Sequence, residues 1–244
     1  MLKFFVLSVL LTSSFYSFAA QSIVLKTNVK VCKSFSPRVC FVLMLSEAQG
    51  DNISDSVHKL TEKRKKFFAF AKQQIPGIQM QKITLHTGTA KVDWPYINNR
   101  YTPEAAEILL FTLPVNEKKA LQLIDAAKKN GMIHVEGRGK ENYAAGAVFY
   151  GVYEDDPALD EIYALTRKRF ETRCAASAAV LGGRVGKMGK LQLTHSDPES
   201  NVIYFREIKI TLPAKFISAD PQTVDIPVEL SAEVSIIKEK GVQK

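Results

Sequence analysis

The chain has 244 residues, carries a formal net charge of +8 and is 46% hydrophobic. This hydrophobic content excludes a disordered chain, because it is sufficient to form a buried core. The length suits one large domain or two small ones. The positive charge does not indicate nucleic-acid binding, because Lys and Arg are mixed with Glu and Asp and no basic motif with interleaved aromatic residues occurs.

The first 19 residues are typical of a secretory signal peptide. Lys3 precedes an apolar run over 4–11, and small or polar residues follow up to Ala19. A transmembrane anchor would need about 20 apolar residues, and Thr12 with the two serines after it interrupts the run. No later stretch is long and apolar enough to span a bilayer. We therefore expect an exported mature chain, with its folded region over about 20–240.

A strand pair is predicted over 22–46. Apolar residues alternate before Cys32, an apolar run follows Cys40, and a Ser-Pro pair between them suits a turn. This pairing would place the two cysteines opposite each other, so we predict a Cys32–Cys40 disulfide in the exported chain. Two separate buried thiols are the alternative. Cys174 falls in a predicted helix, where we expect it to be packed, and the absence of a Cys-x-x-Cys motif gives no support for redox catalysis.

The remaining elements alternate between helices and strand pairs. Helices are predicted at 53–74, 117–129 and 157–181, and further strands at 78–90, 106–115, 132–139, 143–153, 185–195, 202–212 and 228–237. Helices separated by strand pairs favour an α+β fold with largely antiparallel sheets. The part from the second to the fifth strand has the β-α-β-β-α-β order of a ferredoxin-like segment. Two subdomains, at about 20–130 and 131–240, are compatible with this order.

The segment VDWPYINNRYTP, residues 92–103, is predicted to be a loop rich in aromatic residues and proline. Aromatic and Arg side chains are enriched in the cores of protein interfaces. We therefore expect a contact between subunits here, formed by Trp94, Tyr96, Arg100 and Tyr101. The alternative is a loop that folds onto its own sheet.

No catalytic constellation is visible in the sequence. The four histidines fall in different predicted elements and none has a partner at metal-site spacing. The sequence lacks the Gly-x-Ser-x-Gly and His-Glu-x-x-His motifs. We therefore predict a protein that is not an enzyme and that has no cofactor and no metal.

The glycine-rich stretch VLGGRVGKMG, residues 180–189, contains a Gly-Lys pair as phosphate-binding loops do, but it lacks the rest of their sequence pattern. A phosphate loop needs a glycine five residues before its Gly-Lys pair and Ser or Thr after it, whereas Leu181 and Met188 occupy these positions. We predict instead a helix end at Gly182-Gly183 and a strand in which Gly186 and Gly189 allow a bulge or a close approach. Nearby basic residues are candidates for contacting an anionic ligand, with an ordinary basic surface as the alternative: Arg184, Lys187 and Lys190.

Several segments together resemble the SIMPL-domain proteins of bacterial envelopes. They are PGIQMQKITLHT, AEILLFTLPV, LQLIDAAKKNGMIHVEG, the Ala-rich helix ending in LGGRVGKMGKL, and VELSAEVSIIKEK. The resemblance implies a periplasmic protein that assembles into ring- or barrel-like homo-oligomers, and some members of the family are linked to oxidative-stress defence. It supplies no catalytic residues. We therefore expect a self-assembling envelope protein, with a binding module for an anionic envelope ligand as the alternative.

Overall fold

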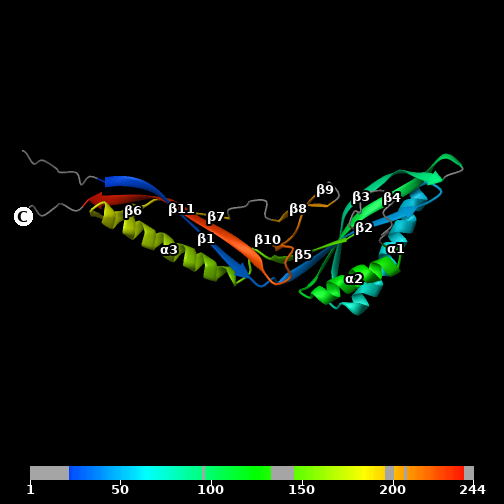
Figure 1. Ribbon diagram of the computed structural model, residues 1–244, viewed down its shortest axis with the longest axis horizontal. Helices are drawn as coiled ribbons and strands as arrows, with labels where there is room; N and C mark the ends of the chain where they lie inside the picture. The colour runs from blue at the N-terminus through cyan, green and yellow to red at the C-terminus, as the bar shows by residue number, and fades with distance from the viewer. Residues whose placement is uncertain (1–21, 95–96, 133–145, 196–200, 206–207, 239–244) are drawn as a thin grey trace, which may run out of the picture. The chain divides into compact units, whose positions relative to one another are not determined.

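The computed structural model describes residues 22–94, 97–132, 146–195, 201–205 and 208–238, and for 89–94 and 97–101 it describes the backbone alone. The predicted signal peptide therefore lies outside the described residues. Within them the chain forms three helices and a set of antiparallel strand pairs, which confirms the predicted α+β class (Figure 1). None of these helices combines the length and the hydrophobicity needed to cross a membrane.

The chain divides into two compact units. Among the described residues, unit 1 contains 22–29, 167–192 and 230–238, and unit 2 contains 30–166 and 193–229. Both units draw on the first and last strands and on the third helix, which are β1 (Ser22–Phe35), β11 (Val224–Lys238) and α3 (Leu159–Val180). These units differ from the two subdomains, at about 20–130 and 131–240, with which the order of elements is compatible.

Unit 2 is built on a five-stranded sheet with the order β10-β5-β2-β4-β3. The strands are β2 (Val39–Gln49), β3 (Gln79–Trp94), β4 (Ile97–Pro114), β5 (Gly146–Val152) and β10 (Phe216–Ser218). Helix α1 (Ile53–Gln74) joins β2 to β3, and α2 (Glu117–Lys129) joins β4 to β5. Because all neighbouring strands of this sheet are antiparallel, each helix joins two strands of like direction that have another strand between them. The ferredoxin-like description and the strand expected at 132–139 stay predictions, since 133–145 lie outside the described residues.

Both faces of this sheet are covered. On one face, helical residues such as Phe67 and Leu123 pack against Val42 and Phe111. On the other face, the β8 (Val202–Phe205) and β9 (Ile208–Thr211) pair covers residues such as Phe41. Burial on both faces explains why β2 reads as an unbroken apolar run. In place of the single strand predicted over 202–212, the chain forms two short strands, β8 and β9, that pair with each other.

The ends of α1 and α2 are fixed by side-chain caps. The Oδ1 atoms of Asn52 and Asn116 each accept a hydrogen bond from a backbone N–H three residues later, at 2.9 Å in both cases. These bonds satisfy N–H groups that have no partner inside the helix. Both helices have the bounds that the sequence predicted.

Unit 1 combines a small sheet with the C-terminal part of α3. The strand order is β1-β11-β6, where β6 is Gly183–Met188, and β7 (Gln192–His195) also pairs with β11. The strict alternation of β11 places Ala232, Val234 and Ile236 on its buried face. Helix α3 buries Phe170 and Cys174 in this unit, so the packed role expected for Cys174 is confirmed.

The expected β1–β2 hairpin and its disulfide are wrong. β1 pairs with β11, whereas β2 pairs with β4 and β5 in another sheet. Cys32 lies on the exposed side of β1, while Cys40 is fully buried in the core that α1 and α2 cover. All three cysteines are free thiols. The alternation around Cys32 indicated a strand correctly, but it carried no information about the partner of that strand.

Candidate functional site

The glycine-rich stretch begins with a helix cap. Gly182 adopts a φ of +64°, and its N–H donates to the carbonyl oxygen of Ala179 at 3.1 Å. This positive φ suits glycine, as predicted for a residue that ends a helix. The stretch lies at the C-terminal end of α3, where free carbonyls and the negative end of the helix dipole disfavour a bound phosphate.

The next glycines allow β6 and the residues after it to lie close to β11. A Cβ atom on Gly183 would lie 2.5 Å from the carbonyl oxygen of Ile237, and one on Gly186 would lie 2.8 Å from the Ser235 Oγ. The pairing also shifts register between Val234 and Ile236. The predicted bulge and close approach are therefore confirmed. The glycines serve the packing of unit 1.

The three basic residues proposed to contact an anion lie on the surface of unit 1. Arg184, Lys187 and Lys190 are all exposed. Lys190 lines a shallow hollow together with Lys26, but the Glu233 carboxylate lines the same hollow. That carboxylate offsets part of the local positive charge. Contact with an anion stays a prediction for these residues.

Unit 1 also exposes several large apolar side chains. Val24 is 62% and Val180 86% exposed, and the full set in this unit is Val24, Val180, Leu181, Met188 and Leu191. Every residue from 187 to 192 is exposed. In the described part of the chain, β1 pairs with β11 alone, so its other edge has no strand beside it. Exposed apolar groups and open strand edges are features of surfaces that associate.

The segment expected to be an aromatic loop is a β-ribbon instead. β3 and β4 continue to pair as far as Trp94 opposite Ile97. The pairing of β2 with β4 ends at Gln49 and Glu104, so beyond this point β3 and β4 pair only with each other. The backbones of Trp94, Arg100 and Tyr101 belong to this ribbon, while their side chains and the whole of Tyr96 lie outside the description. Their role in an interface stays a prediction.

A buried ion pair is the main polar feature that the sequence did not predict. Glu107 on β4 is 1% exposed, and its Oε2 atom accepts a hydrogen bond from Arg64 of α1. Burial raises the pKa of Glu107, and the charges of Arg64 and Lys82 act in the opposite direction. The other carboxylate oxygen has no hydrogen-bond partner among the described residues. A single Glu within the apolar run AEILLFTLPV was the available signal.

The ion pair and the partly buried His195 do not form a recognisable catalytic arrangement. His195 makes an edge contact with Phe216 at a ring distance of 4.8 Å, and its Nε2 lies 3.7 Å from a carboxylate oxygen of Glu154. Burial lowers the pKa of His195, which favours a neutral ring in the folded protein. Among the described residues, no group of three or more His, Cys, Asp or Glu is placed to hold a metal ion. The Arg64–Glu107 pair links α1 to β4, which is a structural role.

The buried cysteines are poor nucleophiles. Burial raises the pKa of Cys40 to about 12 and also raises that of Cys174. The thiolate is the reactive form of cysteine, and a raised pKa makes it scarce at neutral pH. Cys32 is the exposed cysteine, and it therefore offers the accessible thiol.

Comparison with models of known protein families and with curated proteins finds no match to this chain.

Proposed function

We propose that this chain is an exported, non-enzymatic protein of the cell envelope that assembles with copies of itself, as the resemblance to the SIMPL-domain family implies. In this proposal the mature protein is periplasmic and takes part in envelope maintenance or oxidative-stress defence. The signal-peptide pattern of residues 1–19 supports export. The motifs that carry the resemblance are spread along most of the mature chain, which supports a shared architecture.

The observation that carries the self-assembly proposal is the set of exposed apolar side chains in unit 1. Val24, Val180 and Leu191 are large apolar side chains that stand well out into water. Removing apolar area from water contributes roughly 25 cal/mol per Å², so a contact that covers several of these side chains would be favourable. The open edge of β1 adds unpaired backbone groups that a second copy could satisfy.

Size-exclusion chromatography with light scattering tests this proposal on the mature chain. We expect the wild-type protein to elute as a homo-oligomer. Val24→Lys and Leu191→Lys should shift it toward the monomer, because each places a charge in the contact. Leu121→Lys in unit 2 is a matched control, since Leu121 is 51% exposed and Leu191 is 43% exposed. A wild-type chain that stays monomeric at high concentration contradicts the proposal.

The alternative function is binding of an anionic envelope ligand through Arg184, Lys187 and Lys190. The exposure of all three side chains supports it. Binding of this kind should weaken as salt screens the charges. Binding of the anionic ligand should also be lost when Arg184, Lys187 and Lys190 are replaced by Glu.

A further inference from the structure

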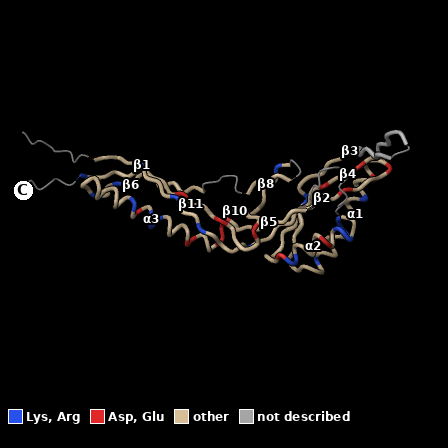
Figure 2. Tube along the Cα trace, in the orientation of Figure 1, with Lys and Arg blue, Asp and Glu red and all other residues tan. Residues whose placement is uncertain are grey.

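The positive charge of the protein is concentrated on the two helices of unit 2. α1 and α2 together contain ten Lys and Arg residues and four Asp and Glu residues. This excess of six accounts for most of the net charge of +8 of the whole chain. Figure 2 shows these Lys and Arg residues in blue along the two helices.

Both helices cover the same face of the five-stranded sheet. Lys63 and Arg64 of α1 are directed inward, to the carbonyl oxygens of Glu47 and Gly131 and to the Glu107 carboxylate. Lys59 and Lys65 are paired with acidic residues of their own helix. Other exposed lysines have no ion-pair partner among the described residues: Lys66, Lys118, Lys128 and Lys129. Their charge is therefore available to an external partner.

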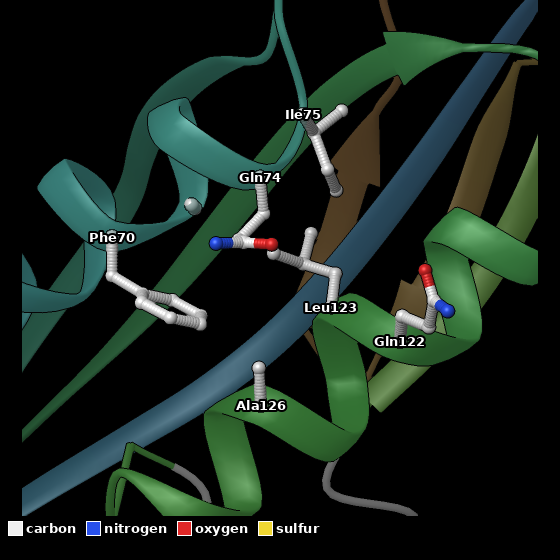
Figure 3. A pocket seen from close by; sticks show the side chains of 7 residues that line it. Phe70, Gln74, Ile75, Gln122, Leu123 and Ala126 are labelled. Carbon is white, nitrogen blue, oxygen red and sulfur yellow. The ribbon is translucent and has the colours of Figure 1, made fainter.

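The same surface contains apolar groups between its lysines. Phe70 of α1 is 38% exposed and Leu121 of α2 is 51% exposed. Phe70 also lines a groove between the helices, together with residues of α2 such as Gln122 and Ala126 (Figure 3). Leu121 follows Lys118 by three positions and precedes Lys128 by seven, so the three side chains share one face of α2. The exposed Asp125 lies on this face too, which therefore carries two Lys charges and one Asp charge.

We propose that this helical surface of unit 2 binds an anionic lipid bilayer. Lysines near an anionic membrane surface contribute attraction that decays within a Debye length, and exposed Phe and Leu side chains enter the boundary between headgroups and acyl chains. A soluble polyanion would match the lysines but would leave Phe70 and Leu121 in water. The combination of unpaired Lys and exposed apolar side chains therefore favours a lipid surface.

Vesicle flotation tests the proposal with the intact mature protein. The wild type should float with vesicles of phosphatidylglycerol and phosphatidylcholine, stay behind with phosphatidylcholine alone, and be released by high salt. The triple variant Lys66→Glu, Lys118→Glu, Lys128→Glu should bind the anionic vesicles at least about 100-fold more weakly. Each Lys near the membrane surface contributes roughly five-fold to the affinity, and the three factors multiply. The matched control is the triple variant Lys168→Glu, Arg169→Glu, Arg173→Glu on the exposed side of α3 in unit 1, which undergoes the same change in net charge and should retain most of the binding.

A second comparison separates a lipid surface from a soluble polyanion. Leu121→Gln should weaken vesicle binding but leave retention on dextran sulfate unchanged, whereas Leu193→Gln, at a similarly exposed site on β7, should change neither. Circular dichroism confirms that each variant is folded. Equal losses in the two triple variants, equal binding to neutral vesicles, or strong dextran sulfate binding with no vesicle binding would each overturn the proposal. None of these results bears on the oligomeric state, so self-assembly is tested separately.

Discussion

Gly183→Ala tests whether the glycines after α3 are required by close packing of β6 on β11. The added methyl group would lie 2.5 Å from the carbonyl oxygen of Ile237 and 3.0 Å from the Cγ2 of Ile236. Ordinary contacts of a Cβ atom lie at 3.4–4 Å, so the methyl group is about an ångström too close to a backbone atom. That oxygen cannot rotate away as the end of a side chain can, and the two strands must separate.

Overpacking of this kind typically costs about 1–3 kcal/mol. We expect Gly183→Ala to fall near the upper end, at about 3 kcal/mol, because the clash involves backbone and interrupts a strand pair. Gly88→Ala is the matched control. Gly88 also lies in a strand, but a Cβ atom there meets nothing within 4 Å. Its replacement should be neutral or stabilise by about 0.4–1 kcal/mol.

Urea unfolding followed by far-ultraviolet circular dichroism measures both effects. We expect Gly183→Ala to lower the unfolding midpoint of unit 1, as one transition or as the first of two, and Gly88→Ala to leave it in place. A change below about 0.5 kcal/mol for Gly183→Ala, the range of ordinary surface substitutions, would refute the account of this strand pair.

The remaining predictions concern the Arg64–Glu107 pair and the three cysteines. Arg64→Met leaves the Glu107 carboxylate buried without its partner, so it should destabilise the protein by about 3–5 kcal/mol at pH 7; a loss no larger than that of Lys65→Met, at an exposed pair, would contradict this. Burial raises the pKa of Glu107 and Arg64 opposes this rise, so Glu107 should take up a proton at higher pH in the variant than in the wild type. The loss should therefore shrink as the pH falls toward 4, and a loss independent of pH in urea titrations would be inconsistent with it. Ellman's reagent should modify Cys32 quickly in the native protein and Cys40 only after unfolding, and unfolding without reductant should release all three thiols. Fewer than three would indicate a disulfide.

Local signals were sufficient for the helices. Their bounds depend on caps such as Asn52 and Gly182, whose geometry involves residues within one turn. The alternation of β11 identified a strand with one buried face for the same reason. In each of these cases the residues that determine the element are neighbours in the sequence.

Long-range pairing could not be predicted in this way. The alternation in β1 is satisfied equally by β2, which is adjacent in sequence, and by its actual partner β11, about 200 residues away. The aromatic and proline content of 92–103 indicated a loop, whereas backbone pairing continues through most of this segment. The Arg64–Glu107 pair was missed because it depends on α1 lying over β4, which no local pattern reports.

The mass of the mature protein in solution tests the central proposal most directly. Light scattering across a concentration series should give a whole multiple of the mass of one mature chain, and Val24→Lys should lower that multiple. A constant single-chain mass at every concentration would contradict the proposal that this protein assembles through unit 1.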